Sequence, residues 1–196
     1  SLRLDMAQSA SFLEFARALK VALKDTWNRD SFDHLVNNAG HGEFAMIGQT
    51  SEAQFDGLFA VHVKGVFFLV QALLPLLADG GRILNLSSGL TRVSYPGFAA
   101  YAAAKAAVEI LTVYMAREFG ARGITVNTVA PGAIETDFGG GLVRDNADVN
   151  AQFAQMTTLG RVGVPDDIGP MIANLLDEGN RWVTAQRIEV SGGQTI

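Results

Sequence analysis

The chain has 196 residues, no cysteine and a formal net charge of −5, with 48% hydrophobic and 18% charged residues. This length suits one well-buried domain, and the lack of cysteine excludes disulfides, thiolate metal sites and thiol nucleophiles, which fits a reducing cytoplasm. An acidic balance without a Lys/Arg cluster gives no sign of nucleic-acid or membrane binding, and the longest apolar stretch, residues 65–78, is too short to span a bilayer.

Apolar periodicity and capping residues divide the chain into alternating strands and helices. The expected strands are residues 2–6, 32–36, 82–86, 125–129 and 187–190. The expected helices are residues 11–26 and 51–78, which begin with capping boxes at Ser11 and Ser51, an alanine-rich helix ending at residue 119, and residues 165–176. Residues 139–163 are rich in glycine and polar residues and predict a mobile lid with some helix of its own.

The strands are continuously apolar rather than alternating, which is typical of a parallel sheet buried on both faces. Together with the strand-helix alternation, this predicts a doubly wound α/β fold of three layers, helix, sheet and helix, formed by residues 1–196 as a single domain. Ligands of such sheets bind beyond the carboxyl ends of the strands. Polar and glycine residues gather at those ends, at Asp5, residues 37–40, Ser87 and Ser88, and residues 131–136.

Tyr101 and Lys105 lie four residues apart near the start of the alanine-rich helix, thirteen residues after Ser88. This spacing puts the phenol and the ammonium group on one helix face. A cation ~4 Å from the phenol, at an effective dielectric of ~20, would favour phenolate by ~4 kcal/mol and lower the tyrosine pKa before desolvation is considered. The same spacing also describes a half-buried tyrosine beside a solvated lysine, so the pair alone does not establish catalysis.

The motifs together resemble the short-chain dehydrogenase/reductase family over the whole chain. They are Asn37-Asn38-Ala39-Gly40, Ser88, Tyr101-x-x-x-Lys105, Asn127-x-x-x-Pro131-Gly132 with Thr136, and Gly192-Gly193. The resemblance implies a Rossmann-like fold and hydride transfer between NAD or NADP and a carbonyl/secondary alcohol pair. The cofactor carries the hydride chemistry, so no metal is expected. The residues do not distinguish NAD from NADP.

The resemblance also implies roles for individual residues. Tyr101 would donate or accept the proton, Lys105 would lower the tyrosine pKa and hold the nicotinamide ribose, and Ser88 would bind the substrate oxygen. Tyr101 and Lys105 would thus also touch the cofactor. The other expected cofactor contacts are Asp5 and Met6 near the adenine, Asn38, Ala39 and Gly40 along the adenosine ribose, and Pro131, Gly132, Ile134 and Thr136 at the nicotinamide end.

Two features depart from the family pattern. His62 stands where the family usually has an asparagine that helps hold a proton-relay water. It is either a catalytic proton shuttle or a buried neutral histidine bonded to a carbonyl. In addition, no glycine-rich phosphate-binding turn precedes Leu2, so two strands and two helices, on the order of 50 residues, are missing, and we expect a further N-terminal segment in the protein.

The apolar lid residues Phe138, Leu142, Val143, Phe153, Met156 and Leu159 suggest a substrate with a hydrophobic body. The resemblance implies a homo-dimer or homo-tetramer. Two alternatives from other functional classes stay open at this point. One is a non-catalytic relative that acts as a binding or regulatory subunit, and the other is a related lyase or epimerase that retains its nucleotide.

Overall fold

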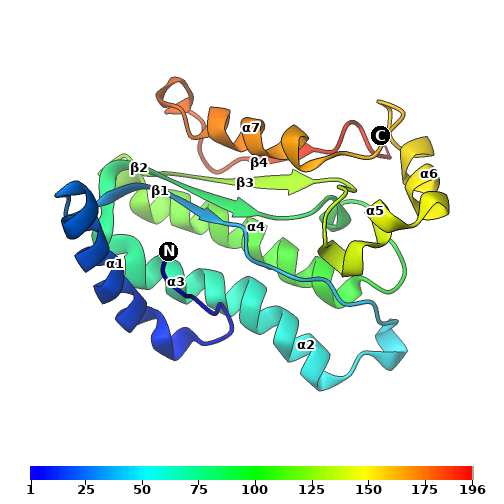
Figure 1. Cartoon of the computed structure of the whole chain (residues 1–196), viewed down its shortest axis with the longest axis horizontal. Helices are drawn as coiled ribbons and strands as arrows, with labels where there is room; N and C mark the ends of the chain where they lie inside the picture. The colour runs from blue at the N-terminus through cyan, green and yellow to red at the C-terminus, as the bar shows by residue number, and fades with distance from the viewer. Residues whose placement is uncertain (196) are drawn as a thin grey trace.

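The computed structural model describes residues 1–195, and its four strands form one parallel sheet in the order β1-β2-β3-β4. The strands are β1 (Phe32–Asn37), β2 (Leu77–Leu86), β3 (Thr125–Pro131) and β4 (Arg187–Val190). Because all pairings are parallel, the four carboxyl ends lie at one edge of the sheet (Figure 1). That edge is where the sequence predicts the ligand site.

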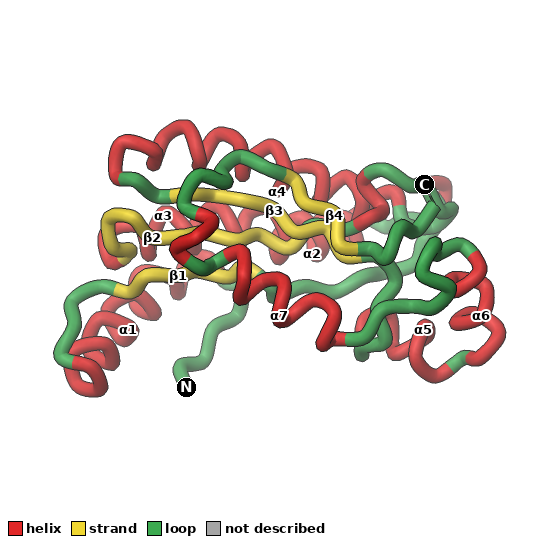
Figure 2. Tube along the Cα trace, turned by 90° about the horizontal axis from the view of Figure 1, so that it is seen from above, coloured by secondary structure: helices red, strands yellow, loops and turns green. Residues whose placement is uncertain are grey.

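Helices cover both faces of the sheet, which confirms the three-layer α/β fold. On one face lie α1 (Phe12–Trp27), α2 (Glu52–Phe59), α3 (Val66–Leu73) and α4 (Ala99–Phe119), whereas α7 (Pro165–Leu175) crosses the other (Figures 1 and 2). The short helices α5 (Leu142–Asp145) and α6 (Ala147–Gln155) lie between β3 and α7 in the expected lid segment. The larger hydrophobic cluster packs α1, α3 and α4 on the sheet, and a smaller cluster around Leu84 and Val129 holds α7.

Three local expectations are wrong. Residues 2–6 form no strand, because no neighbouring strand lies beside them to complete a ladder. The helical region ends at Leu76 rather than near Ala78, and β2 begins at Leu77, where it already pairs with β1. The Ser11 capping box does not form, since the Ser11 hydroxyl donates to the Gln8 carbonyl oxygen at 2.8 Å. The second capping box, Ser51 with Gln54, is present.

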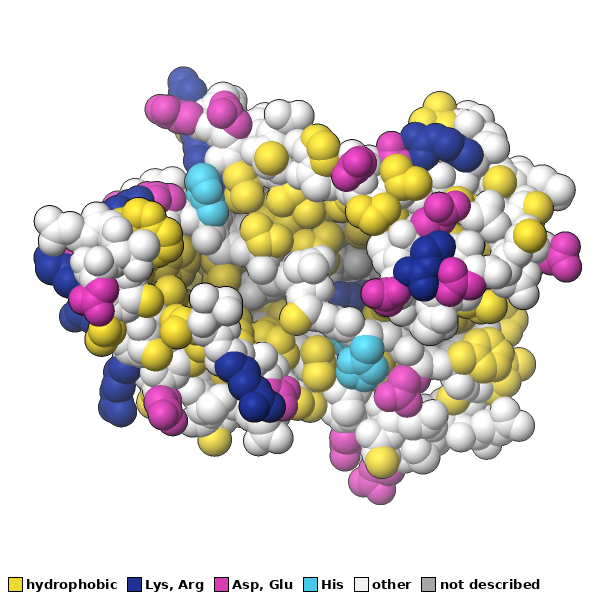
Figure 3. Space-filling model, viewed as in Figure 1, with side chains coloured by type: hydrophobic (Ala, Val, Ile, Leu, Met, Phe, Trp, Pro, Cys, Tyr) yellow, Lys and Arg dark blue, Asp and Glu magenta, His cyan; other side chains and the backbone are white. Residues whose placement is uncertain are grey.

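Within the described chain, β1 pairs with β2 alone, so its other edge is unpaired. A groove of about 400 Å³ lies along that edge, lined mainly by apolar side chains that include Leu4, Phe15 and Leu69. Hydrophobic side chains also gather on this side of the molecule in Figure 3. An unpaired edge with apolar surroundings can accept a further strand.

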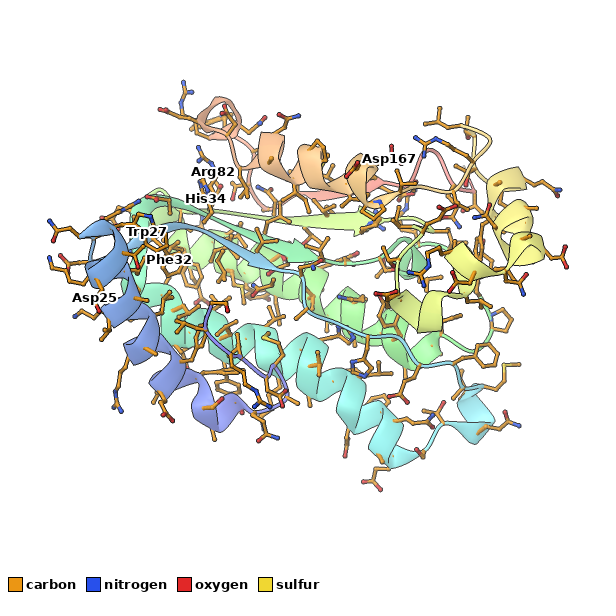
Figure 4. All side chains as sticks on the ribbon, in the orientation of Figure 1. Asp25, Trp27, Phe32, His34, Arg82 and Asp167 are labelled. Carbon is orange, nitrogen blue, oxygen red and sulfur yellow. The ribbon has the colours of Figure 1, made fainter. Side chains whose placement is uncertain are left out.

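The amino ends of the strands, opposite the expected site, are closed by polar contacts. Arg82 Nη1 donates to the Leu176 carbonyl oxygen at 2.8 Å and lies 3.4 Å from His34 Nε2. Figure 4 shows the two labelled side chains, Arg82 and His34, next to each other. His34 therefore has a surface role at the far end of the sheet.

Two helical stretches, Glu52–Leu76 and Ala99–Arg122, are long and apolar enough to cross a bilayer by length and composition. This differs from the expectation drawn from uninterrupted apolar runs, because the helices are longer than any single run. In this fold both stretches pack beside each other on the sheet, and their inward residues, such as Val70 and Val108, are 2% and 1% exposed. Core helices meet the same criterion.

Candidate active site

Ser88 is presented by a turn at the carboxyl end of β2. The Ser87 amide still donates to the Val129 carbonyl oxygen at 2.7 Å, so the chain leaves the sheet only after this residue. Ser88 then caps the 3₁₀ turn Gly89–Thr91, and its hydroxyl oxygen accepts from the Leu90 amide at 3.2 Å. This turn fixes the direction in which the Ser88 hydroxyl points.

Tyr101 and Lys105 lie in the first two turns of α4, and each is 5% exposed. The Lys105 Nζ lies 5.8 Å from the centroid of the Tyr101 ring and donates to the Leu86 carbonyl oxygen at 2.8 Å. The Ser88 side chain lies near enough to the Tyr101 hydroxyl to lower the tyrosine pKa. The structure therefore brings Ser88, Tyr101 and Lys105 to one place, as the sequence predicts.

Burial dominates the protonation of this pair. It raises the pKa of Tyr101 to about 12, although the Ser88 side chain lowers it, and it lowers the pKa of Lys105 to about 8. The expected fall of the tyrosine pKa is wrong for this structure. Desolvation of the buried phenolate is the largest influence on this pKa. Tyr101 is consequently a protonated donor at neutral pH.

His62 lies in a π-helical turn, Ala60–Gly65, which joins α2 to α3, and it is 1% exposed. Its Nε2 is 2.7 Å from the His41 carbonyl oxygen, so Nε2 carries the hydrogen and Nδ1 is an acceptor. Within residues 1–195 that Nδ1 has no hydrogen-bond partner. Burial, followed by the Lys105 charge, lowers the pKa of His62 to about 4. These facts favour a buried neutral histidine over a proton shuttle.

The His62 ring connects the turn after β1 with α4. It stacks on the His41 ring with centroids 5.5 Å apart and meets the Tyr101 ring edge-on at 5.4 Å. Gly40 of the Asn38-Ala39-Gly40 turn lies so close that a Cβ there would be 2.5 Å from His62 Cε1. Only glycine fits this position without displacing the imidazole.

The expected nicotinamide-end residues follow β3 in a second tight turn. Pro131 ends β3, and the Gly132 amide donates to the Val190 carbonyl oxygen at 3.2 Å. A Cβ on Gly132 would lie 2.6 Å from Gln194 Oε1. Ile134 forms a bridge with Gly163, and the Thr136 hydroxyl accepts from the Phe138 amide at 3.2 Å. This turn lies at the carboxyl edge of the sheet, like Asn38 to Gly40.

The two residues expected near the adenine, Asp5 and Met6, differ in their exposure to solvent. Met6 is 7% exposed and belongs to the larger hydrophobic cluster, and its carbonyl oxygen lies against Gly65. Met6 also lines the groove along β1, together with Asn38 and Ala39, so its contact with the adenine stays a prediction. Asp5 is exposed, and its carboxylate accepts from the Ala7 amide at 2.9 Å.

The residues present fit a nicotinamide nucleotide. An ammonium group has three donors, and within the described chain Lys105 uses one of them, on Leu86. The remaining donors of a buried cation suit the vicinal hydroxyls of a ribose. Gly40 and Gly132 have no side chain and are packed too closely against their neighbours to carry one. At these two turns the main chain itself can therefore approach a ligand closely.

Sequence reasoning missed two features of the site. Phe138 packs on Tyr101 with ring centroids 5.4 Å apart and fills the space in front of Gly42. Arg187 and Glu109 form an ion pair at 2.8 Å behind Ser88. The second feature had a visible signal, because a charged residue in an apolar strand and another in an alanine-rich helix both require a partner.

Comparisons with known proteins agree with this geometry. Residues 3–195 match the family model described as Enoyl-(Acyl carrier protein) reductase. An NADPH-dependent aldehyde reductase-like protein of Arabidopsis thaliana is 40% identical over 165 residues, which cover 81% of this chain and 60% of the relative. The 3-oxoacyl-[acyl-carrier-protein] reductase FabG of Staphylococcus aureus is 37% identical over 181 residues, which cover 91% of this chain and 72% of the relative.

Among solved structures, the angucycline C-6 ketoreductase LanV with bound NADP has a TM-score of 0.89 and 36% identity, with coverage of 97% of this chain and 73% of that one. The chain thus spans 60% and 72% of the length of the two curated relatives. All three names describe reductases. They give no support to a non-catalytic subunit, a lyase or an epimerase.

Proposed function

The chain belongs to the short-chain dehydrogenase/reductase family of NAD(P)-dependent oxidoreductases, and we propose that its protein transfers a hydride between NADP(H) and a carbonyl or secondary alcohol. The observation that carries the proposal is the meeting of Ser88, Tyr101 and Lys105 at the carboxyl edge of the sheet. The choice of NADP(H) is supported by the NADPH-dependent relative and by the NADP bound to LanV.

In the reductive direction the Tyr101 hydroxyl donates its proton to the substrate oxygen as negative charge develops there. Ser88 holds the same oxygen by a hydrogen bond, which orients the carbonyl and adds a donor. Lys105 binds the ribose hydroxyls and stabilises the phenolate that remains on Tyr101. The bound nicotinamide supplies the hydride. In the oxidative direction the same groups return the proton.

We propose a ketone or aldehyde with an apolar body as the substrate. Phe138 packs on the Tyr101 ring with ring centroids 5.4 Å apart, and Phe44 packs on Phe98, just before α4, with ring centroids 5.8 Å apart. Phe138 and Phe44 are both partly exposed. Tyr95 and Phe153 add an aromatic pair with ring centroids 5.7 Å apart, and the Tyr95 hydroxyl contacts the Met156 sulfur at 3.5 Å. The structural neighbour LanV is an angucycline C-6 ketoreductase, which agrees with an apolar substrate.

We further propose a cytoplasmic homo-dimer or homo-tetramer that contains this chain as part of a single domain. The outward side of the α2, α3 and α4 layer carries six exposed hydrophobic residues, Phe55, Phe67, Phe68, Ile110, Val113 and Tyr114. A surface of this kind is typical of a protein interface. Light scattering of the protein and of an Ile110→Glu variant tests the assembly, because a charge at the interface should shift the protein toward the monomer.

The function is tested with the full-length protein, a panel of apolar ketones and aldehydes, and nicotinamide absorbance as the readout. Tyr101→Phe should lower turnover about 10²–10⁴-fold, because it removes the proton donor, while NADPH fluorescence shows unchanged binding. Tyr114→Phe, on the exposed side of α4, is the matched control and should retain turnover. Full turnover in Tyr101→Phe would contradict the proposal.

A further inference from the structure

A cluster of charged and hydroxyl groups lies directly behind the turn that carries Ser88. Glu109 of α4 is its centre, and a single carboxylate oxygen, Oε1, accepts from the Ser87 hydroxyl at 2.5 Å and the Thr91 hydroxyl at 2.8 Å. The same oxygen accepts from Arg187 Nε at 2.8 Å. One side chain thus binds both ends of the segment that contains Ser88.

Arg187 of β4 completes the contact with the turn itself. Its Nη2 donates to the Ser88 carbonyl oxygen at 3.3 Å and to the Thr91 hydroxyl at 3.1 Å. Its Nη1 donates to Glu189 Oε2 at 3.0 Å, which holds the guanidinium from the side away from Ser88. The planar guanidinium therefore fixes the turn against β4 in one orientation.

The burial of the pair shows that it is more than a solvated surface contact. The side chains of Arg187 and Glu109 are each 19% exposed, in contrast to 45% and 48% for the surface pair Arg29 and Asp33. Exposed pairs contribute little, but a largely buried pair whose hydrogen bonds are satisfied fixes geometry. The hydrogen bonds that Arg187 and Glu109 form with uncharged groups all go to Ser87, Ser88 and Thr91.

The direction of the Ser88 hydroxyl depends on this turn, because its oxygen also accepts from the Leu90 amide. A displacement of about 1 Å in a reacting group lowers a rate by on the order of 10²-fold. We propose that Arg187, held by Glu109, is a positioning residue that fixes the turn of Ser88 beside Tyr101. The inference rests on the proposed function for its effect on turnover, but its effect on the turn does not.

The variant to test is Arg187→Met in the full-length protein, alone and combined with Ser88→Ala. Arg122→Met is the matched control, since Arg122 clamps the opposite end of β2. It donates to Asp79 Oδ1 at 2.7 Å and to the carbonyl oxygens of Leu74 and Leu77. Loss of either arginine should lower thermal stability similarly, so a purely structural effect would appear in both.

We expect Arg187→Met to lower kcat about 10–100-fold with Ser88 present and less than about threefold in the Ser88→Ala background, with unchanged binding of NADPH. Arg187→Lys, which keeps the charge beside Glu109, should recover part of the loss. Equal losses in both backgrounds, or the same loss in Arg122→Met, would overturn the inference.

Hydrogen exchange supplies a readout that does not require turnover. The amides of residues 89–93 should exchange faster in Arg187→Met than in wild type and stay protected in Arg122→Met, because of these two arginines only Arg187 contacts the turn. Unchanged protection in Arg187→Met would refute the positioning role. If wild type showed no turnover with faster exchange in Arg187→Met, the proposed function would fail while this inference stood.

Discussion

Lys105 should make the folded protein less stable than a methionine at the same position. Burial lowers its pKa from 10.5 to about 8, which corresponds to about 3 kcal/mol of unfavourable free energy for the charged form. Lys105→Met removes this penalty but also removes the hydrogen bond to the Leu86 carbonyl oxygen, worth about 1 kcal/mol. We therefore expect the free energy of unfolding of Lys105→Met to be about 2 kcal/mol higher than that of wild type at pH 7. The variant should nevertheless be inactive.

The pH dependence gives the sign of the effect. Between about pH 8 and 10.5 the unfolded state binds more protons at this lysine than the folded state, so the stability contributed by Lys105 rises with pH across that window. The advantage of Lys105→Met should thus be largest below pH 8 and shrink by pH 9.5 in urea unfolding. Lys20→Met, at an exposed position of α1, is the control. A destabilised Lys105→Met at pH 7 would refute the reasoning.

Three further outcomes are expected. Turnover and NADPH affinity should fall as pH rises through about 8, because Lys105 loses its proton there; a flat profile to pH 10 in a steady-state assay would contradict this. His62→Asn should leave the shape of the pH–rate profile between pH 5 and 8 unchanged, since the pKa of His62 is already about 4. A fall in rate centred near pH 6.5 that occurs only in wild type would instead support a proton shuttle at His62. Gly40→Ala should lower the free energy of unfolding by about 1–3 kcal/mol in urea titrations by displacing the His62 ring, whereas Gly48→Ala, with nothing within 4 Å, should change it by less than about 0.5 kcal/mol.

The elements with strong local signals could be predicted from the sequence. The Ser51 capping box, the helix that ends at Phe119 and the strand Arg187–Val190 occur where the pattern placed them. Each of these elements has its own capping residue, helix breaker or apolar run, so its position depends little on tertiary contacts. Tyr101 and Lys105 share a face for the same reason, since helical spacing alone decides it.

The failures arise where a neighbour decides the outcome. Residues 2–6 have strand propensity, but a strand also needs a partner to pair with. The spacing of Tyr101 and Lys105 predicts the effect of charge on the tyrosine pKa, whereas the burial that raises this pKa depends on packing by residues distant in sequence. The π-helical turn at His62 and the contact of Phe138 with Tyr101 have no local signal at all.

A chain of buried hydrogen bonds explains how the site keeps its geometry across three strands and a helix. Asn37 of β1 donates to Asn85 of β2 at 2.8 Å, Asn85 donates to Thr112 of α4 at 2.8 Å, and Thr128 of β3 donates to Thr112 at 2.7 Å. Thr112 also donates to its own helix at the Val108 carbonyl oxygen. A shift of any strand by one residue would leave these groups unpaired in the core, at about 1–3 kcal/mol each. These polar contacts therefore fix the strand register on which the position of Ser88 near Tyr101 depends. Apolar contacts alone would fix the register less strictly, because apolar side chains can shift along one another without leaving a polar group unpaired.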